Sequence, residues 1–548
     1  MGGRIHEMSG KTTQYDGTVD RTASPERAFV LGLDGVPWNL LENWIEAGEL
    51  ENFGRLAEEG AAGPLESTVP PSTPLAWPSI ATGTRADKHG VYGFKTLSSN
   101  YQQRMQTSED IEHPELWELV SPALVGNVPM TYPARELSGQ LVTGMLSPSM
   151  DERFTYPRGL KDDIVESIPE YEIGLSWSEY EGREDEFLED LTSLVEARRE
   201  LMRRFMQVDD WRLFFFVFTS PDRLQHLVWD EDVLLNHYQL LDDILGEILE
   251  YVAQQDAVLF VVSDHGFGPI SKFVYVNRVL EEAGYLVRAD ESGTRGLLSR
   301  LGISKDGIQS TMANLGISEE SVLKILPESM VTTVAEQVPG THEIYDIDHS
   351  ETKAFVIGSG TVYVNDKGRF DEGIVDPADI PKIKREIWSV FESVTDPETG
   401  EPVLDVWDGD DVFPTDEQGP DLVVRGRDGD QKATSLTDSV IAPSGAMVGG
   451  HHNEGIVLAW GPSIQSGSIP TTATVVDIAP TILHCLGEPV TDAMDGRVLT
   501  ELLHPDSAAA TQRIETREYN GGPTAANDEG ADDYEDVEER LRGLGYME

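Results

Sequence analysis

The chain has 548 residues, of which 39% are hydrophobic and 25% charged. This length allows two to four domains of about 150 residues, and the composition excludes collagen-like and wholly disordered classes. Asp and Glu number 98 against 41 Lys and Arg, so the net charge is −57. Such a surface repels phosphate backbones, and we expect no binding to nucleic-acid polymers. The acidic residues are spread along the whole chain, which we interpret as a halophilic adaptation that makes the melting temperature depend on KCl.

The sequence shows neither a disulfide nor a targeting segment. Cys485 is the only cysteine, which excludes an intramolecular disulfide and a thiolate metal site. Residues 1–27 lack the apolar core of a signal peptide. The longest apolar runs, such as Leu213–Phe218, are far shorter than the ~18 residues that span a bilayer. We therefore expect a cytoplasmic protein with no membrane partner.

Apolar runs that end in polar residues alternate with helical patterns. Three runs have the composition of buried parallel strands: Ala28–Gly35, Arg212–Asp222 and Ala257–Gly266. Residues Glu184–Gln207 and Leu234–Val252 carry apolar side chains at helical spacing. This alternation predicts an α/β fold whose sheet is mostly parallel and has helices on both faces. A further run, Gly455–Pro462, is unusual because its polar motif comes before it.

The alternation of predicted strands and helices is interrupted in the second half of the chain. We expect a disordered leader over residues 1–26 and a catalytic core made of residues 27–285 plus 441–505. Residues 286–440 are expected to form an inserted cap or substrate region. Residues 506–548 are acidic and poor in apolar residues, which predicts a largely disordered tail. Its last turn, Val537–Tyr546, has the pattern of a short helix that docks on the core.

Acidic and imidazole side chains follow the predicted strands. In open α/β sheets ligands bind outside the carboxyl ends of the strands, so these side chains are expected to meet. Alone, each has an ordinary explanation: an Asp-Gly pair marks a turn, and Asp222 has the position of a helix cap. Together they form an oxygen and nitrogen set that suits two divalent ions, Zn²⁺ or Mn²⁺. The set comprises Asp34, Asp222, His226, Asp264, His265 and the pair His451 and His452.

A hydroxyl for such ions to activate lies near the start of a predicted helix. Thr73 has the position of its N-cap, Pro74 that of the first helical residue, and Gly83 lies just past the end. The cap is one explanation of Thr73. The other is a metal-activated nucleophile beside a helix N-terminus that helps to hold a phosphoryl group.

The order of these motifs resembles that of the alkaline phosphatase superfamily, in particular its type I phosphodiesterase/nucleotide pyrophosphatase branch. The resemblance extends over roughly residues 28–505 and implies an alkaline-phosphatase-like sheet with an inserted cap. It rests on LGLDG (31–35), STPLAWPSIATG (72–83), HGVYGF (89–94), NVPMTYP (127–133), SPDRLQH (220–226), SDHGFGP (263–269), GGHHNEGIVLAWGP (449–462) and VVDIAPTILHCLG (475–487).

The resemblance implies a role for each matching residue. Thr73 would be the nucleophile, with Ser72 as the alternative. His451 would be a ligand in preference to His452, because Gly455 follows it at the family's spacing. His89 would be structural. One ion would be held by Asp34, Thr73, Asp264 and His265, and the other by Asp222, His226 and His451.

Two departures from the family patterns bear on the substrate. Nucleotide pyrophosphatases have a phosphate-binding Asn three residues after the nucleophile, where this chain has Ala76. Another donor, such as Lys272 or a backbone N–H, would then bind the phosphate. The Cys/Ser-x-Pro-x-Arg pattern of sulfatases is missing from both Ser72 and Thr73.

We therefore predict a two-metal phosphohydrolase that acts on a small phosphorylated substrate, most simply a phosphodiester. The alternatives are a phosphomonoesterase, a phosphotransferase or mutase, a sulfatase and a non-catalytic metal-binding protein.

Overall fold

The computed structural model describes residues 24–175, 180, 182–289, 346–427, 429–519, 534, 537, 538 and 541. Most of the predicted leader and much of the predicted tail lie outside these residues. Within the described part of the tail, α18 (Ala508–Thr511) and β21 (Thr516–Arg517) are formed. The side chains of Val537 and Leu541 are buried against the core. No helix of the described residues is both long and apolar enough to span a bilayer.

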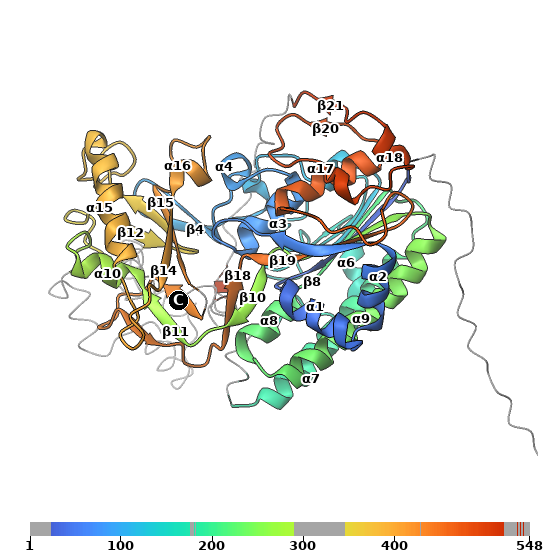
Figure 1. Ribbon diagram of the computed structural model, residues 1–548, viewed down its shortest axis with the longest axis horizontal. Coiled ribbons are helices and arrows are strands. Elements are labelled where there is room, and N and C mark those ends of the chain that lie inside the picture. Colours follow the sequence, from blue (N-terminus) through green and yellow to red (C-terminus); the bar gives the residue numbers. More distant parts are fainter. Residues whose placement is uncertain are drawn as a thin grey trace, which may run out of the picture.

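The centre of the fold is a twisted eight-stranded sheet with the strand order β2-β19-β9-β1-β8-β5-β6-β7 (Figure 1). Strands β9, β1, β8, β5 and β6 run parallel, whereas β2, β19 and β7 join the sheet through antiparallel pairs. The prediction of a mostly parallel α/β sheet is thus confirmed. The strands are β1 (Ala28–Leu33), β2 (Ala61–Glu66), β5 (Ala123–Val128), β6 (Gly139–Thr143), β7 (Thr155–Tyr156), β8 (Leu213–Phe218), β9 (Val258–Val262) and β19 (Glu454–Trp460).

Both faces of the sheet are covered by helices. Alternate residues of the central strands enter two different apolar clusters: Phe214 and Phe216 face one side, Phe215 and Val217 the other. This is why the strands read as continuous apolar runs. The first face packs against α1 (Trp38–Ala47), α2 (Glu51–Glu59), α7 (Glu184–Phe205) and α9 (Glu231–Gln254). The second packs against α3 (Thr73–Thr82), α5 (Leu116–Leu119) and α17 (Ile478–Cys485).

The antiparallel direction of β19 explains its unusual motif order. Val457 pairs with Val262 and Trp460 with Leu259, so β19 begins at the edge where β9 ends. A residue that precedes β19 therefore lies at the same edge as residues that follow β1, β8 and β9. His451 and His452 lie in β18 (Gly449–His452), which pairs antiparallel with β10 (Gly266–Pro269) just beyond β9.

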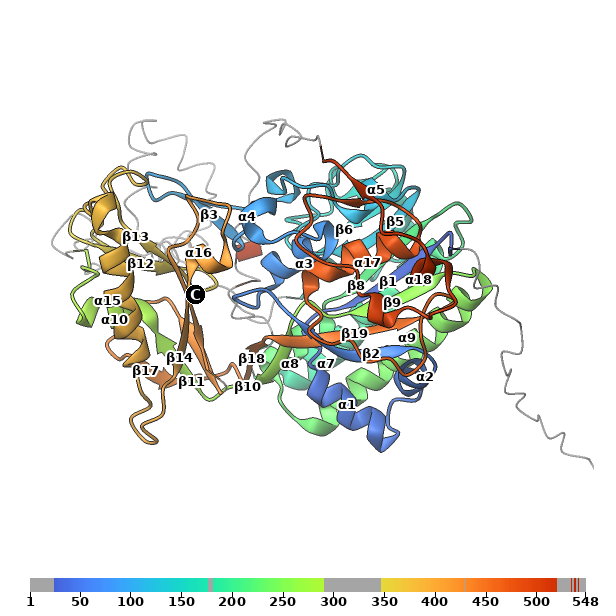
Figure 2. The same ribbon diagram turned by 45° about the horizontal axis from the view of Figure 1, so that its top comes forward.

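We call residues 286–440 the cap. Its described part contains a four-stranded sheet of its own and one long helix, which form the lobe at the left of Figures 1 and 2. A three-stranded sheet, β16-β11-β17, connects this lobe to the core. The main elements of the cap are β12 (Ala354–Ile357), β13 (Thr361–Val364), α15 (Ile380–Glu392), β14 (Leu404–Asp408), β15 (Leu422–Gly426) and β16 (Asp430–Ala433). The elements next to it in the sequence, outside residues 286–440, are β11 (Lys272–Tyr275), α10 (Val276–Glu282) and β17 (Ile441–Pro443).

One glycine of β1 makes room for an indole of α3. A Cβ on Gly32 would lie 2.4 Å from Trp77 Cη2 and 2.7 Å from Val217 Cγ2, and both side chains are fully buried. We expect Gly32→Ala to destabilise the fold by about 1–3 kcal/mol through overpacking. Gly54, in the middle of α2, has only Ile45 Cγ2 at 3.8 Å from its added Cβ. Gly54→Ala should therefore stabilise the protein by roughly 0.5–1 kcal/mol through helix propensity.

The two variants form a matched pair in a thermal melt. Gly32→Ala is expected to lower the melting temperature and Gly54→Ala to raise it. Equal melting temperatures for the two variants would contradict the close packing of Trp77 on β1.

Candidate metal centre

The sequence-predicted ligands meet at the carboxyl edge of the central sheet. Asp34 directly follows β1, and Asp264 and His265 follow β9. Asp222 and His226 lie one turn apart on α8 (Ser220–Leu227), which begins two residues after β8. His451 arrives from β18, next to the start of β19. The sheet order places β9, β1 and β8 side by side, so their polar ends converge.

The first group of side chains comprises Asp34, Asp264 and His265, all completely buried. His265 Nε2 lies 3.3 Å from Asp264 Oδ2 and 3.7 Å from Asp34 Oδ1. Thr73 Oγ1 is 3.2 Å from the same nitrogen. Asp34 Oδ1 and Asp264 Oδ2 are buried and receive no hydrogen bond from any described residue. These two oxygens therefore have the placement expected of metal ligands.

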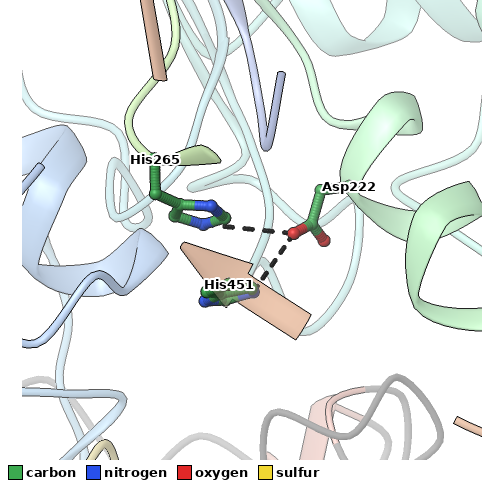
Figure 3. A group of neighbouring side chains, drawn as sticks. All are labelled: Asp222, His265 and His451. Carbon is green, nitrogen blue, oxygen red and sulfur yellow. Dashed lines mark ion pairs between the residues drawn. The ribbon is translucent and has the colours of Figure 1, made fainter. Parts of the chain in front are cut away.

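The second group comprises Asp222, His226 and His451. Asp222 Oδ1 lies 3.3 Å from His451 Nε2 and 3.6 Å from His226 Nε2, and the two nitrogens are 3.1 Å apart. Asp222 Oδ1 is also 4.0 Å from His265 Nε2. Figure 3 shows His265 and His451 directed toward the Asp222 carboxylate from two different segments. His265 thus lies where the two groups adjoin.

The three histidines present the same nitrogen to the centre. Each Nδ1 lies near a backbone carbonyl: Gly266 O at 3.1 Å from His265, Gly449 O at 3.3 Å from His226, and Pro71 O at 3.2 Å from His451. These contacts assign the Nδ1–H tautomer to each ring, with the N–H donating to the carbonyl. The Nε2 lone pairs are then directed at one another and at the carboxylates. The Nε2 atoms of His226 and His451 are 3.1 Å apart, and their lone pairs repel each other unless a cation or a proton lies between them.

Electrostatics favours a cation over a proton at this place. Burial lowers the pKa of His226 to about 4, and burial and His451 lower the pKa of His265 well below its ordinary value. Burial and the neighbouring carboxylates Asp264 and Asp222 raise the pKa of Asp34. The pKa of Asp264 is likewise raised, by burial and by Asp222. Burial opposes ionisation of Asp222, but His226 and His451 bring its pKa below its ordinary value.

Neutral imidazoles beside repelling, buried carboxylates fit divalent metal ions. The donor set contains only nitrogen and oxygen atoms, as Zn²⁺ and Mn²⁺ sites do.

Several contacts that fix the ligands were not predicted from the sequence. Trp77 Nε1 donates to Asp34 Oδ2 at 3.1 Å, which leaves Oδ1 without a donor. The backbone N–H of Gly35 donates to Asp264 Oδ1 at 3.2 Å. Trp77 lies four residues after Thr73 in a helix whose residues are all buried. Its indole was therefore indistinguishable from an ordinary core side chain.

The strand alternation separates the two adjacent histidines. Side chains of successive residues in a strand point to opposite faces. His451 faces the centre, whereas a Cβ on Gly268 would lie 2.5 Å from His452 Cε1, so the His452 ring covers Gly268 of β10. The structure therefore brings His451, and not His452, to the group. His89 lies elsewhere, buried against Ser79 Oγ at 3.1 Å.

Two details of the predicted helix start are corrected. The N-cap of α3 is Ser72, with φ −159°, and Thr73 is the first helical residue. Thr73 does not cap the helix but directs its hydroxyl at His265. The N–H groups of Leu75 and Ala76 both donate to Ser72 O, at 3.0 and 2.9 Å, and proline at 74 has none. These N–H groups are therefore not available for a phosphoryl group.

Lys272, the other donor suggested by the sequence, forms an ion pair with Asp396 of the cap.

The chain is similar to known proteins in two of three comparisons. The murine ectonucleotide pyrophosphatase/phosphodiesterase 5 aligns over 87% of this chain and 100% of its own, with 13% identity and a TM-score of 0.48. The human protein of the same name gives the same values, as does an inactive variant of the murine protein in complex with AMP. A search of curated proteins found no match. The family model named type I phosphodiesterase/nucleotide pyrophosphatase matches residues 28–429, about three quarters of the sequence. The chain belongs to the type I phosphodiesterase/nucleotide pyrophosphatase family.

Proposed function

We propose that the protein is a two-metal phosphodiesterase that acts on a small substrate and uses Thr73 as its nucleophile. The observation that carries this proposal is the convergence of three imidazole Nε2 atoms and three buried carboxylates beside the Thr73 hydroxyl. Membership in the phosphodiesterase family supports the same reaction class. The net charge of −57 disfavours a nucleic-acid polymer as substrate.

The distances suggest how the residues would be shared between two ions. One ion would be held by Asp34, Thr73, Asp264 and His265, and the other by Asp222, His226 and His451. His265 is close enough to Asp222 to contribute to either. Ions bound there would supply Lewis-acid stabilisation of developing negative charge and a local positive potential for an anionic substrate.

The chain's own residues would then act in a defined order. Thr73 Oγ1 loses its proton to solvent and attacks phosphorus in line with the leaving oxygen. The bond from phosphorus to the leaving group breaks, and Thr73 becomes esterified to the phosphate, which still carries the second alcohol of the substrate. The leaving alcohol takes a proton from solvent. Water then loses a proton and attacks the same phosphorus, the bond from phosphorus to Thr73 Oγ1 breaks, a phosphomonoester is released, and the threonine oxygen takes a proton back from solvent.

Two structural features prepare this chemistry. Thr73 is completely buried and lies at the first position of α3, so its side chain has a fixed direction. Trp77, one turn later in the same helix, donates to Asp34 and thereby links the nucleophile's helix to a ligand. The burial of every member of the group except the partly exposed His451 limits the access of bulk water, which strengthens the electrostatic interactions among them.

Hydrolysis of three chromogenic esters tests the proposal. The chelated protein would be assayed in molar KCl with Zn²⁺ or Mn²⁺ added back, against bis-p-nitrophenyl phosphate, p-nitrophenyl phosphate and p-nitrophenyl sulfate. We expect the diester to be hydrolysed at least about tenfold faster than the monoester, and only after metal is restored. A preference for the monoester would identify a phosphatase or mutase, and a preference for the sulfate ester a sulfatase. Either result would contradict a phosphodiesterase.

A further inference from the structure

A hairpin of the cap reaches the residue next to the proposed nucleophile. The loop Gly358–Gly360 joins β12 to β13, and Ser359 Oγ lies 2.9 Å from Ser72 Oγ. The loop is held tightly, because a Cβ on Gly360 (φ 105°) would lie 2.1 Å from Val424 O of β15. The loop therefore holds Ser359 beside Ser72, the residue that precedes Thr73.

A lysine of the cap is attached to the same loop. Lys432, in β16, donates from Nζ to Gly358 O at 2.6 Å. Gly358 directly precedes Ser359, so one loop of the cap contacts both Lys432 and Ser72, the neighbour of Thr73.

A second cation of the cap contacts the other segment of the centre. Arg425, in β15, donates from Nη1 to Asn453 Oδ1, two residues after His451. Its guanidinium lies over the Trp407 ring at 5.3 Å and pairs with Asp405 at 3.1 Å. Asn453 O in turn accepts from Ser67 N at 2.8 Å.

The segments that contact Lys432 and Arg425 also adjoin each other. His451 Nδ1 donates to Pro71 O, and Pro71 directly precedes Ser72. Both cations therefore contact segments that lie beside the ligand group, at Ser72 and at His451. We call Ser359, Arg425 and Lys432 the basic rim.

Two basic side chains and a hydroxyl at this place match an anionic group. In a chain with net charge −57, two basic side chains on segments that adjoin the same ligand group are a specific feature, although Arg425 is paired with Asp405. Ala76, three residues after Thr73, offers no polar side chain to a substrate.

From this geometry, and resting on the proposed function, we infer that the basic rim binds a second anionic group of the substrate, a phosphate or a carboxylate, beyond the scissile phosphorus. The protein would then prefer diesters that carry such a group over diesters that do not.

A pair of substrates that differ only in one phosphate tests the inference. These are the p-nitrophenyl ester of thymidine 5′-monophosphate and the same ester with an added 3′-phosphate. For the metal-loaded protein we expect kcat/KM to be at least about tenfold higher for the phosphorylated ester. Lys432→Met should lower this ratio about tenfold, and Lys432→Arg should keep most of it. The assay uses the lowest KCl concentration at which the melting temperature is unchanged, because salt screens the effect.

A matched control carries the same change of charge. Lys367 is an exposed lysine of the cap, and Lys367→Met should leave the ratio unchanged. A wild-type ratio near one, or equal ratios for Lys432→Met and Lys367→Met, would overturn the inference. If neither ester is hydrolysed, the proposed function fails instead. The rim is then tested by the Kd of thymidine 3′,5′-bisphosphate relative to thymidine 5′-monophosphate, which Lys432→Met should raise about tenfold and Lys367→Met should not.

Discussion

Replacing Thr73 by alanine is expected to lower kcat for a phosphodiester by roughly 10⁴-fold or more, because the nucleophile is lost. Thr73 Oγ1 is the hydroxyl that lies 3.2 Å from His265 Nε2, inside the ligand group. The bound metal and the melting temperature should change little, since three carboxylates and three histidines remain. Kinetics with metal analysis and a thermal melt measure these quantities on one preparation.

Two further variants separate Thr73 from its neighbour. Thr73→Ser keeps a hydroxyl and should recover part of the activity. Ser72→Ala removes the hydroxyl that contacts Ser359 and should cost at most about tenfold. Mass spectrometry of acid-quenched wild-type protein should find the phosphate, with the retained alcohol of the substrate, attached to Thr73. An active Thr73→Ala variant beside an inactive Ser72→Ala variant would assign the nucleophile to Ser72.

Asp34→Asn is expected to have opposite effects on the metal-free and metal-loaded proteins. Burial and the nearby Asp264 and Asp222 carboxylates raise the pKa of Asp34, so its ionised form destabilises the metal-free fold. The amide removes that charge. The melting temperature of the chelated protein should therefore rise, by about 1 °C for each kcal/mol of repulsion relieved, because the unfolding entropy of a chain of this size is roughly 1 kcal/mol/K. The increase in melting temperature that metal produces should shrink, because one ligand charge is gone.

The raised pKa of Asp34 also makes the stability of the chelated wild-type protein depend on pH. A carboxyl group whose folded pKa is raised binds its proton more tightly in the folded state. Its contribution to stability is complete below the ordinary pKa of Asp and is lost as pH rises through the raised value. The melting temperature of the chelated wild type should accordingly fall with rising pH more steeply than that of Asp34→Asn. Saturating metal should remove the difference in slope.

Asp256→Asn is the control for the loss of one negative charge. Asp256 is exposed in the turn before β9, with φ 50°, a conformation that Asn adopts readily. This variant should respond to metal as the wild type does. If Asp34→Asn and Asp256→Asn behave alike with and without metal, Asp34 is not a ligand.

The ligands that follow the strands could be predicted because the pattern that marks them lies within a few neighbouring residues of the sequence. A parallel strand buried on both faces is a continuous apolar run, and the polar residue after it is conspicuous in the sequence. The spacing of Asp222 and His226 indicated one face of a helix, and α8 has that geometry. The early position of His451 relative to its strand was visible too. Its cause, the antiparallel direction of β19, required the sheet order.

The remaining features depend on contacts between distant segments. Ser72 and Ser359 are 287 residues apart, and no periodicity relates them. From the sequence, Trp77 is expected to be an ordinary core residue. Its indole packs on Gly32 and also donates to Asp34, but the sequence pattern would be the same if it only packed. The predicted start of α3 was one residue too late, because Ser72 and Thr73 are both good capping residues.

The most direct test of the two-metal centre is a crystal structure of the zinc-loaded protein with anomalous data collected at the zinc edge. We expect two anomalous peaks per chain. One should be coordinated by Asp34, Asp264 and His265 beside Thr73 Oγ1, and the other by Asp222, His226 and His451. Zinc bound away from these atoms, or no zinc bound at all, would contradict the proposed centre and with it the role of Thr73.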